Sequence, residues 1–285
     1  MNQNYSVLMS VYKKENPKFL KMAIESMLNQ SIPTNDFVLV CDGPLTQELN
    51  CVIDEFVTQY KQLFHVLRLP VNMGLGNALN SGIFACKNSL IARMDSDDIS
   101  LSKRCEMQLK QFQNDSQLAL CSGYIAEFVN NIQNIKTIRQ VPTAHENILK
   151  YAKKRNPMNH MAIMYRKDAV LNSGNYIEVN MAEDYYLWVR MLQNGYKASN
   201  IDSLLVYVRT GNGMYKRRGG WKYVKNIYHL EKMLLDSNFI SYPEFLRNCS
   251  IRISVSLIPS KAREYFYQKN LRNSIKYQTK KNENK

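Results

Sequence analysis

Short apolar runs alternate with longer segments of helical periodicity along the N-terminal part of the chain. The runs lack strict apolar–polar alternation, which is typical of strands buried on both faces of a sheet. They lie at residues 5–11, 36–41, 64–69 and 89–94. Strands of this kind separated by helices predict an α/β fold, with a mainly parallel central sheet and helices on both of its faces.

The helical segments have recognisable ends. The first is predicted over residues 16–28, with Asn16 as its cap and a proline in its first turn. A second helix is predicted over about residues 47–60, and a third over residues 74–86. In the second half of the chain, the apolar residues 161–165 predict a further strand.

Polar residues gather where three of the predicted strands end. Ser10-Val11-Tyr12 closes the first strand, Asp42 follows the second, and residues 95–98 follow the fourth. Ligands of parallel α/β sheets bind beyond the carboxyl ends of the strands. We therefore expect these three segments to meet at one edge of the sheet and to form a binding site.

Three carboxylates, those of Asp95, Asp97 and Asp98, fall within four positions at the end of the fourth strand. Their mutual repulsion favours a bound cation or a ribose hydroxyl at this place. Alternation along an extended segment puts Asp95 and Asp97 on one side, where their oxygens suit Mg²⁺ or Mn²⁺ bound to nucleotide phosphates. The alternative is an ordinary acidic strand exit, with Asp as turn residue or helix cap.

Composition narrows the class of protein. A hydrophobic fraction of 45% over 285 residues can build a large core. The six cysteines show no C-x-x-C spacing, which indicates buried free thiols and a reducing compartment. The N-terminal residues carry no export signal, and no stretch approaches the roughly 18 apolar residues that span a bilayer. We therefore expect a cytoplasmic location.

The net charge of +14 is concentrated near the C-terminus. Residues 216–285 hold 16 Lys or Arg against 5 Asp or Glu, which favours a polyanionic partner. Charged, aromatic and apolar residues are interleaved over residues 253–269, as in interfacial membrane elements, so we expect contact with an anionic membrane surface. A solvated helix packed on the domain is the alternative. No RNA or DNA module accompanies the charge, so no nucleic-acid partner is expected.

Four sequence blocks in order resemble the nucleotide-binding half of the family 2 glycosyltransferases, in particular bacterial O-antigen and exopolysaccharide enzymes. The resemblance covers about 100 residues and implies a Rossmann-like GT-A fold, a nucleotide-sugar donor such as a UDP-sugar, and Mn²⁺ or Mg²⁺ as cofactor. The blocks are Tyr5-Ser-Val-Leu-Met-Ser-Val-Tyr12, Val38-Leu-Val-Cys-Asp42-Gly, Asn72-x-Gly74 continuing to Asn80, and Met94-Asp-Ser-Asp-Asp98.

The resemblance also implies roles at the matching positions. Ser10 and Asp42 would contact the base, and Asp95 and Asp97 would reach the ribose and the diphosphate. Asp97 or Asp98 would hold the metal, and which of the carboxylates is the direct ligand stays open. The other positions assigned to the donor are Val11, Tyr12, Asn72, Gly74, Asn80, Arg209, Lys216 and Arg217.

Glu183 and Asp184 open an amphipathic segment of helical periodicity. Acids near a helix N-terminus are favourable for electrostatic reasons alone, so an ordinary first-turn pair is the alternative. The pair resembles the family's acidic motif, in which the second acid is the base. We therefore predict Asp184 as the general base of a single-displacement, inverting transfer, and Glu183 as its orienter or as an acceptor ligand.

Two further features are assigned by resemblance. Asn159 and His160 precede the strand predicted at 161–165 and, together with Trp188, are predicted to face the acceptor. The loop at residues 209–220 combines glycines with four cations, which suits a segment that closes over a leaving diphosphate. Many family members carry a His in this loop and this chain does not, so its metal shell is incomplete by the family pattern.

We expect a metal-dependent inverting glycosyltransferase, peripheral on the cytoplasmic face of the inner membrane. It would transfer a hexose or N-acetylhexosamine to a lipid-diphosphate-linked saccharide in surface polysaccharide biosynthesis. The predicted organisation is a GT-A domain at 1–215, with a nucleotide-binding half at 1–98 and an acceptor half at 99–215, and a basic, amphipathic helical region at 216–285.

Two alternatives belong to other classes. A sugar-1-phosphate nucleotidyltransferase also uses an α/β nucleotide fold with Mg²⁺ carboxylates, but it calls for an N-terminal glycine-rich phosphate loop. Residues 10–16 contain no glycine. A noncatalytic sugar- or lipid-binding module has no need of both the acidic cluster after the fourth strand and the Glu183-Asp184 pair.

Overall fold

The computed structural model describes residues 4–179, 181–210 and 220–259. Its first half follows the predicted alternation of strands and helices within a residue or two at each end. Asn16 caps the first helix, because its side-chain oxygen accepts a hydrogen bond of 2.9 Å from the Lys18 amide. The elements are β1 Tyr5–Val11, α1 Pro17–Leu28, β2 Asp36–Cys41, α2 Gln47–Gln59, β3 Phe64–Arg68, α3 Leu75–Ala85 and β4 Leu90–Asp95.

The four strands of this half are parallel and lie in the order β3-β2-β1-β4. The register pairs Ser10 with Asp95 and Val11 with Cys41, and the Asp42 amide donates to the Val11 carbonyl at 2.8 Å. The ends of β1, β2 and β4 therefore meet at one edge of the sheet, which confirms the predicted convergence.

The second half turns the sheet into a mixed one. Strand β8 lies antiparallel between β4 and β6, β6 pairs parallel with β9, and β7 and β5 add antiparallel edges. The prediction of a mainly parallel sheet is wrong, because four of the eight pairings among the described strands are antiparallel. The elements are β5 Ile99–Ser100, α4 Arg104–Asn114, β6 Leu118–Val129, β7 Asn131–Arg139, α5 His145–Ala152, η1 His160–Ala162, β8 Met164–Arg166, α6 Lys167–Asn172, α7 Glu183–Gln193 and β9 Lys197–Arg209.

The strand predicted at 161–165 is also corrected. Its first half is the 3₁₀ turn η1, in which the Ala162 amide donates to the Asn159 carbonyl at 3.0 Å and the Ile163 amide donates to the His160 carbonyl at 3.2 Å. Strand β8 begins only at Met164, after Ile163, and ends at Arg166. The turn competes with the strand for these backbone groups, and apolar composition alone does not distinguish the two.

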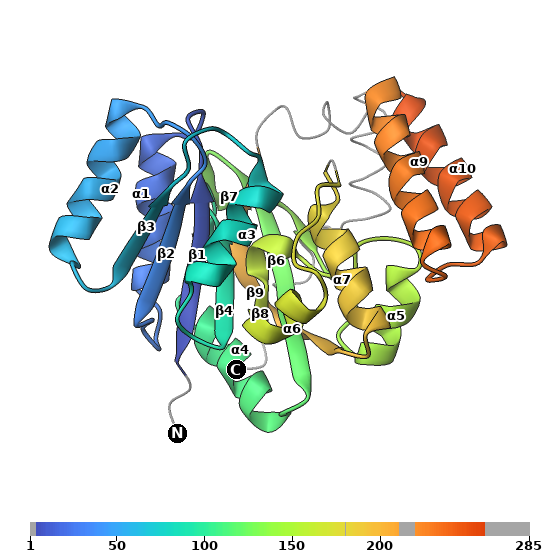
Figure 1. The fold of residues 1–285 in the computed structure, drawn as a ribbon, viewed down its shortest axis with the longest axis horizontal. Coiled ribbons are helices and arrows are strands. Elements are labelled where there is room, and N and C mark those ends of the chain that lie inside the picture. The colour runs from blue at the N-terminus through green and yellow to red at the C-terminus, as the bar shows by residue number, and fades with distance from the viewer. Residues whose placement is uncertain (1–3, 180, 211–219, 260–285) are drawn as a thin grey trace.

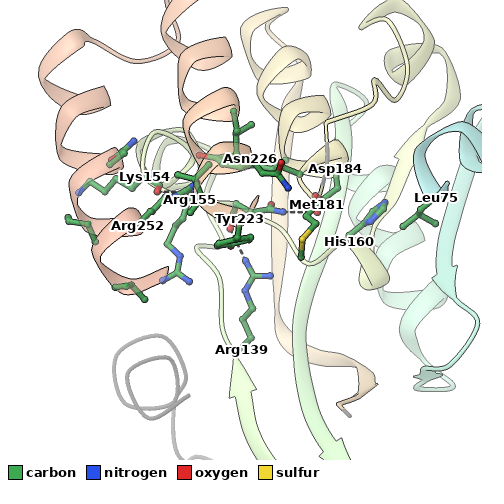
Figure 2. Close-up of a pocket in the computed structure, with 18 of the residues that line it drawn as sticks. Leu75, Arg139, Lys154, Arg155, His160, Met181, Asp184, Tyr223, Asn226 and Arg252 are labelled. Carbon is green, nitrogen blue, oxygen red and sulfur yellow. Dashed lines mark hydrogen bonds between the residues drawn. The ribbon is translucent and has the colours of Figure 1, made fainter. Parts of the chain in front are cut away.

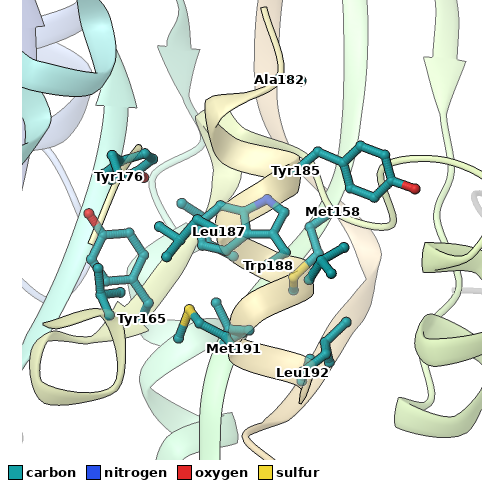
Figure 3. Packing of buried hydrophobic residues seen from close by; sticks show 14 of the residues in the cluster. Met158, Tyr165, Tyr176, Ala182, Tyr185, Leu187, Trp188, Met191 and Leu192 are labelled. Carbon is teal, nitrogen blue, oxygen red and sulfur yellow. The ribbon is translucent and has the colours of Figure 1, made fainter. Parts of the chain in front are cut away.

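Helices cover both faces of the sheet, as predicted (Figure 1). One core lies between the sheet and α1, α2 and α4, and it includes Ile24, Phe56 and Leu109. The other lies under α3, α6 and α7, and Trp188 of α7 is fully buried in it among Tyr165, Tyr176, Met158 and Met191 (Figure 3). This second core fixes α7, whose first residues are the predicted catalytic acids.

Two further helices, α9 Trp221–Asp236 and α10 Tyr242–Leu257, form a hairpin at the end of the molecule opposite α1 and α2 (Figure 1). Ser241 and Glu244 form a capping box at the start of α10. Leu230, Leu234 and Phe245 join the hairpin to the core under α7. No described helix is long and apolar enough to cross a bilayer. Residues 260–285, which hold much of the basic segment, lie outside the described ranges.

Helix α3 packs so closely on the sheet that one position has no room for a side chain. A Cβ atom at Gly82 would lie 2.3 Å from Leu8 Cδ1 and 2.8 Å from Val40 Cγ2. We expect Gly82→Ala to lower the free energy of unfolding by about 1–3 kcal/mol, measured by urea denaturation. Gly76→Ala in the same helix is the matched control, because its Cβ would lie 3.7 Å or more from its neighbours. Equal losses in the two variants would contradict this packing.

Candidate active site

The acidic cluster forms a tight turn at the end of β4. Asp95 is the last residue of the strand, and Ser96 and Asp97 already lie in the turn, so the predicted extended segment with Asp95 and Asp97 on one side is not present. Asp95 Oδ1 lies 2.5 Å from Arg93 Nη2 in an ion pair, and Asp98 Oδ1 accepts a 2.8 Å hydrogen bond from the Arg209 amide. The turn is thus held from two strands.

Negative charge is in excess at this turn. Burial, followed by repulsion from Asp95 and Glu15, raises the pKa of Asp97 to about 7. Burial and then the Asp97 and Asp95 carboxylates raise the pKa of Asp98 well above its usual range. A cation would relieve this repulsion.

The acidic turn offers only a few protein ligands to a divalent ion. Among the described residues, no group of three or more His, Cys, Asp or Glu side chains is arranged to hold a metal ion. Mg²⁺ in nucleotide sites commonly takes one or two carboxylates and completes its shell with phosphates and water. The acidic turn fits such a site, with the remaining ligands supplied by the nucleotide.

Asp42 anchors a neighbouring loop. Its carboxylate accepts hydrogen bonds from Asn72 Nδ2 at 2.8 Å, from the Met73 amide at 2.6 Å and from the Gly74 amide at 3.1 Å, and its exposed fraction is 4%. Gly74 adopts φ +85°, a conformation that favours glycine. Asp42, Asn72 and Gly74 therefore lie together at the edge of the sheet where β1, β2 and β4 end. The Asp42 carboxylate already accepts hydrogen bonds from two backbone amides and from the Asn72 side chain.

Of the other residues predicted to bind the nucleotide sugar, some lie at this edge of the sheet and some lie in the interior. Ser10 is half-buried beside Asp95, Val11 is buried, and Tyr12 is exposed at the edge. Asn80 lies in α3 and forms two hydrogen bonds of 2.8 Å with the Tyr176 backbone, so its amide clamps the segment before α7.

A cavity of about 700 Å³ opens between this edge and the C-terminal hairpin. Asp184 and His160 line it from a helix and a turn (Figure 2), together with Asp95 from the end of a strand, although the three are far apart in the sequence. Its other walls come from the segment around Asn156 and from α9 and α10.

Asn156 positions the carboxylate of Asp184. Its Nδ2 donates a 2.6 Å hydrogen bond to Asp184 Oδ2, and its own carbonyl accepts a 2.8 Å hydrogen bond from Arg139 Nη2. Burial raises the pKa of Asp184, and the hydrogen bond from Asn156 opposes this shift. The result is a half-buried carboxylate, held in one orientation, at the wall of the cavity.

Glu183 points elsewhere. It lines a second cavity of about 180 Å³ beside Gly74 and Gly76, and burial, followed by the nearby Asp184 carboxylate, raises its pKa to about 7. The hydrogen bond that orients Asp184 comes from Asn156, whereas the sequence analysis assigned this role to Glu183.

Comparisons with known proteins identify the family of this chain. Residues 6–171 match the family described as Glycosyl transferase family 2. The chain belongs to this family. It is 38% identical over 94% of its length to an uncharacterized glycosyltransferase of Haemophilus influenzae, of which it covers 99%. It is 37% identical over 94% of its length to an Escherichia coli UDP-Gal:alpha-D-GlcNAc-diphosphoundecaprenol beta-1,3-galactosyltransferase, of which it covers 96%.

The fold is also that of solved glycosyltransferases. The structure of S. aureus TarS 1-349 in complex with UDP-GlcNAc aligns with a TM-score of 0.63 at 15% identity, over 98% of this chain and 78% of that one. The predicted family and GT-A fold are therefore confirmed, with a mixed sheet in place of the mainly parallel one.

The three residues predicted to face the acceptor have different surroundings in the structure. His160 lines the large cavity, with Nε2 2.8 Å from Tyr176 Oη, and burial followed by the Arg93 charge lowers its pKa, which keeps the ring neutral. Asn159 is fully buried and donates to the Gly123 carbonyl at 2.7 Å. Trp188 is fully buried in the core. Asn159 and Trp188 support the cavity wall and do not line it.

Arg209 braces the acidic turn. Its guanidinium lies between the rings of Phe19 and Phe128, at 3.7 and 4.7 Å from their centroids, and its Nε donates to the Asp97 carbonyl at 3.1 Å. Lys216 and Arg217, assigned to the same loop, lie outside the described residues.

Arg93 and Asn156 are the site residues of the glycosyltransferase that the sequence analysis missed. The sequence does contain a signal for Arg93. Residues i and i+2 of a strand lie on the same face, so Arg93 is expected to lie beside Asp95. None exists for Asn156, whose partner is 28 positions away.

Proposed function

We propose that this glycosyltransferase transfers a hexose or N-acetylhexosamine from a UDP-sugar to a lipid-diphosphate-linked saccharide, with inversion at the anomeric carbon. The observation that carries the proposal is that Asp95, at the acidic turn, and Asp184 line one cavity. The Escherichia coli relative is named as a galactosyltransferase that uses UDP-Gal and acts on a GlcNAc-diphosphoundecaprenol. This name supports both the donor class and the acceptor class.

Asp184 is the general base of this mechanism. Its carboxylate accepts the proton of the acceptor hydroxyl as that oxygen forms a bond to C1 of the donor sugar. The bond from C1 to the nucleotide diphosphate breaks on the opposite face, and the diphosphate leaves with the electron pair. One carboxylate suffices and no covalent intermediate forms, so an α-configured donor gives a β-linked product. The raised pKa of Asp184 makes it a stronger base than an ordinary aspartate.

The acidic turn holds Mn²⁺ or Mg²⁺ in this proposal. Asp97, together with Asp95 or Asp98, would be the protein ligands, and the bound ion would neutralise charge on the diphosphate. Arg93 and Arg209 orient the turn through Asp95 and the Asp97 carbonyl. Ser10, Tyr12 and the loop anchored by Asp42 would form the nucleotide side.

The domain division of the sequence analysis is part of the proposal. Residues 1–98 bind the donor, residues 99–215 the acceptor, and residues 216–285 contact the cytoplasmic face of the membrane. Support comes from aromatic and apolar side chains that the hairpin exposes, Trp221, Tyr228, Tyr242, Leu246, Ile251 and Leu257. Sedimentation with anionic but not with zwitterionic vesicles is the measurement; equal sedimentation with both would refute an electrostatic contact.

A transfer assay tests the function directly. Purified protein is incubated with a panel of UDP-sugars, with Mn²⁺ or with EDTA, and with a synthetic GlcNAc diphosphate carrying a short lipid. We expect one donor to give product only with the metal, and NMR of the product to show a β linkage. An α-linked product from an α-linked donor would refute inversion, and nucleotidyl transfer without glycosyl transfer would favour the nucleotidyltransferase alternative.

Removal of the Asn156 side-chain amide should change the pH dependence of kcat/KM. This amide stabilises the charged form of Asp184, so Asn156→Ala should raise the pKa of Asp184 further. A base acts in its deprotonated form, and the acidic limb of the kcat/KM profile should therefore move to higher pH. Asn50→Ala, which removes an amide on α2 outside the cavity lining, should leave the limb in place. An unchanged limb in Asn156→Ala would exclude Asp184 as the titrating base.

A further inference from the structure

The large cavity continues from Asp184 to the C-terminal hairpin, and its chemistry changes along the way. Asp95 and Asp184 are the carboxylates among the described residues of its lining. Figure 2 shows Lys154, Arg155 and Arg252 grouped on one side of the cavity and His160 on the other. Besides Arg93, which pairs with Asp95, the basic residues of the lining are Arg139, Lys154, Arg155, Arg247 and Arg252.

A buried network holds the basic segment against the hairpin. Arg252 pairs with the fully buried Glu231 at 2.9 Å and donates to the Lys154 carbonyl at 3.0 Å. Asn248 donates to the Lys153 carbonyl at 2.8 Å and to Glu231 at 2.9 Å. Glu231 therefore balances the charge of Arg252, and the network fixes the backbone that carries Lys154 and Arg155 next to α10.

Two of the remaining cations have no carboxylate partner in the described part of the chain. The Lys154 side chain is exposed and makes no ion pair there. Arg247 donates to Asn248 Oδ1 at 2.9 Å and likewise has no carboxylate within ion-pair distance. Two cations from different segments, lining one cavity and making no ion pair within the described residues, form a site for an anion.

The same lining also includes aliphatic side chains of the hairpin. Ile227 of α9 and Ile251 and Val255 of α10 belong to it, and Ile251 is 55% exposed. One cavity thus holds a carboxylate, cations and aliphatic side chains. These groups match the parts of a saccharide joined through a diphosphate to a lipid.

We propose that Lys154 and Arg247, with Arg155 next to Lys154 in the cavity lining, form a binding subsite for the diphosphate of the acceptor, separate from the place of the donor diphosphate at the acidic turn. The inference rests on the proposed function and adds the residues that recognise the acceptor. Binding of the diphosphate by the hairpin and the 153–155 segment places the attached sugar toward Asp184, where its hydroxyl loses the proton.

Arg247→Ala tests the subsite, because the Arg247 side chain is exposed and donates hydrogen bonds to the Asn248 side chain, so the variant should fold. We expect the KM for a lipid-linked GlcNAc diphosphate to rise roughly ten- to a hundredfold, with kcat and the donor KM nearly unchanged. An acceptor in which an alkyl glycoside replaces the diphosphate should show the same KM in both proteins. Lys225→Ala, an exposed cation of α9 outside the cavity lining, is the matched control.

The outcomes separate this inference from the proposed function. A rise in the donor KM, or equal changes with both acceptors, would overturn the subsite. If no lipid-linked diphosphate is a substrate, the proposed function fails and binding decides the subsite: a short-chain prenyl diphosphate is titrated by calorimetry with UDP and Mn²⁺ present to occupy the donor site. Weaker binding to Arg247→Ala than to Lys225→Ala supports it, and equal or absent binding overturns it.

Discussion

Asp184→Asn should lower kcat by about a hundred- to ten-thousandfold while the donor binds with nearly unchanged affinity. The substitution keeps the shape of the side chain and removes its ability to accept the proton of the acceptor hydroxyl. Asp184 lines the large cavity from α7, whereas the edge formed by β1, β2 and β4 carries the proposed donor site. Initial rates of transfer, together with calorimetric titration of the UDP-sugar, measure both quantities.

Glu183→Gln is the control for this variant. It changes the adjacent acid by the same chemistry, but Glu183 lines the smaller cavity and gives Asp184 no hydrogen bond that the structure records. We expect its kcat to fall less than about tenfold, below the usual range for a general base. A larger loss in Glu183→Gln than in Asp184→Asn would reverse the assignment of the base.

Asp97→Asn should remove most of the metal-dependent affinity for the donor, by about a hundredfold or more. Asp97 is a half-buried carboxylate repelled by Asp95 and Glu15, and a divalent ion is the partner that such a group of charges lacks. Calorimetric titration with UDP and Mn²⁺, repeated with EDTA, measures the effect. Asp54→Asn, an exposed acid of α2, is the control and should leave binding unchanged.

The pH dependence of metal binding follows from the same residue. The pKa of Asp97 is about 7, raised by burial and then by repulsion from Asp95 and Glu15, and a metal ligand must be deprotonated. Affinity for Mn²⁺ in the parent protein should therefore increase as the pH rises through about 7. The increase should be smaller in Asp97→Asn. The same slope in both proteins would exclude Asp97 as the titrating ligand.

The parts of the fold that the sequence predicts well are those with local causes. The Asn16 cap, the apolar run of β2 and the break at Gly74 each act over a few residues, and all three appear where the pattern places them. The donor edge follows as well, because parallel strands deliver their carboxyl ends to one place.

The parts that it misses depend on distant partners. Strand β8 is inserted antiparallel between β4 and β6, and its three residues Met164–Arg166 carry no signal for that pairing. Asn156 reaches Asp184 through the fold alone, and the hairpin that completes the large cavity comes from a segment in which charge was the dominant feature. Long-range contacts of this kind leave no periodicity to read.

Strand β8 also has a consequence for motion. It hydrogen-bonds to β4 on one side and to β6 on the other, so the parallel strands of residues 1–98 and the strands of residues 99–215 form one continuous sheet. A hinge between the two halves would have to break several ladder hydrogen bonds at about 1 kcal/mol each and open the core beneath them. Closure over the substrates therefore cannot be a rotation of one half against the other.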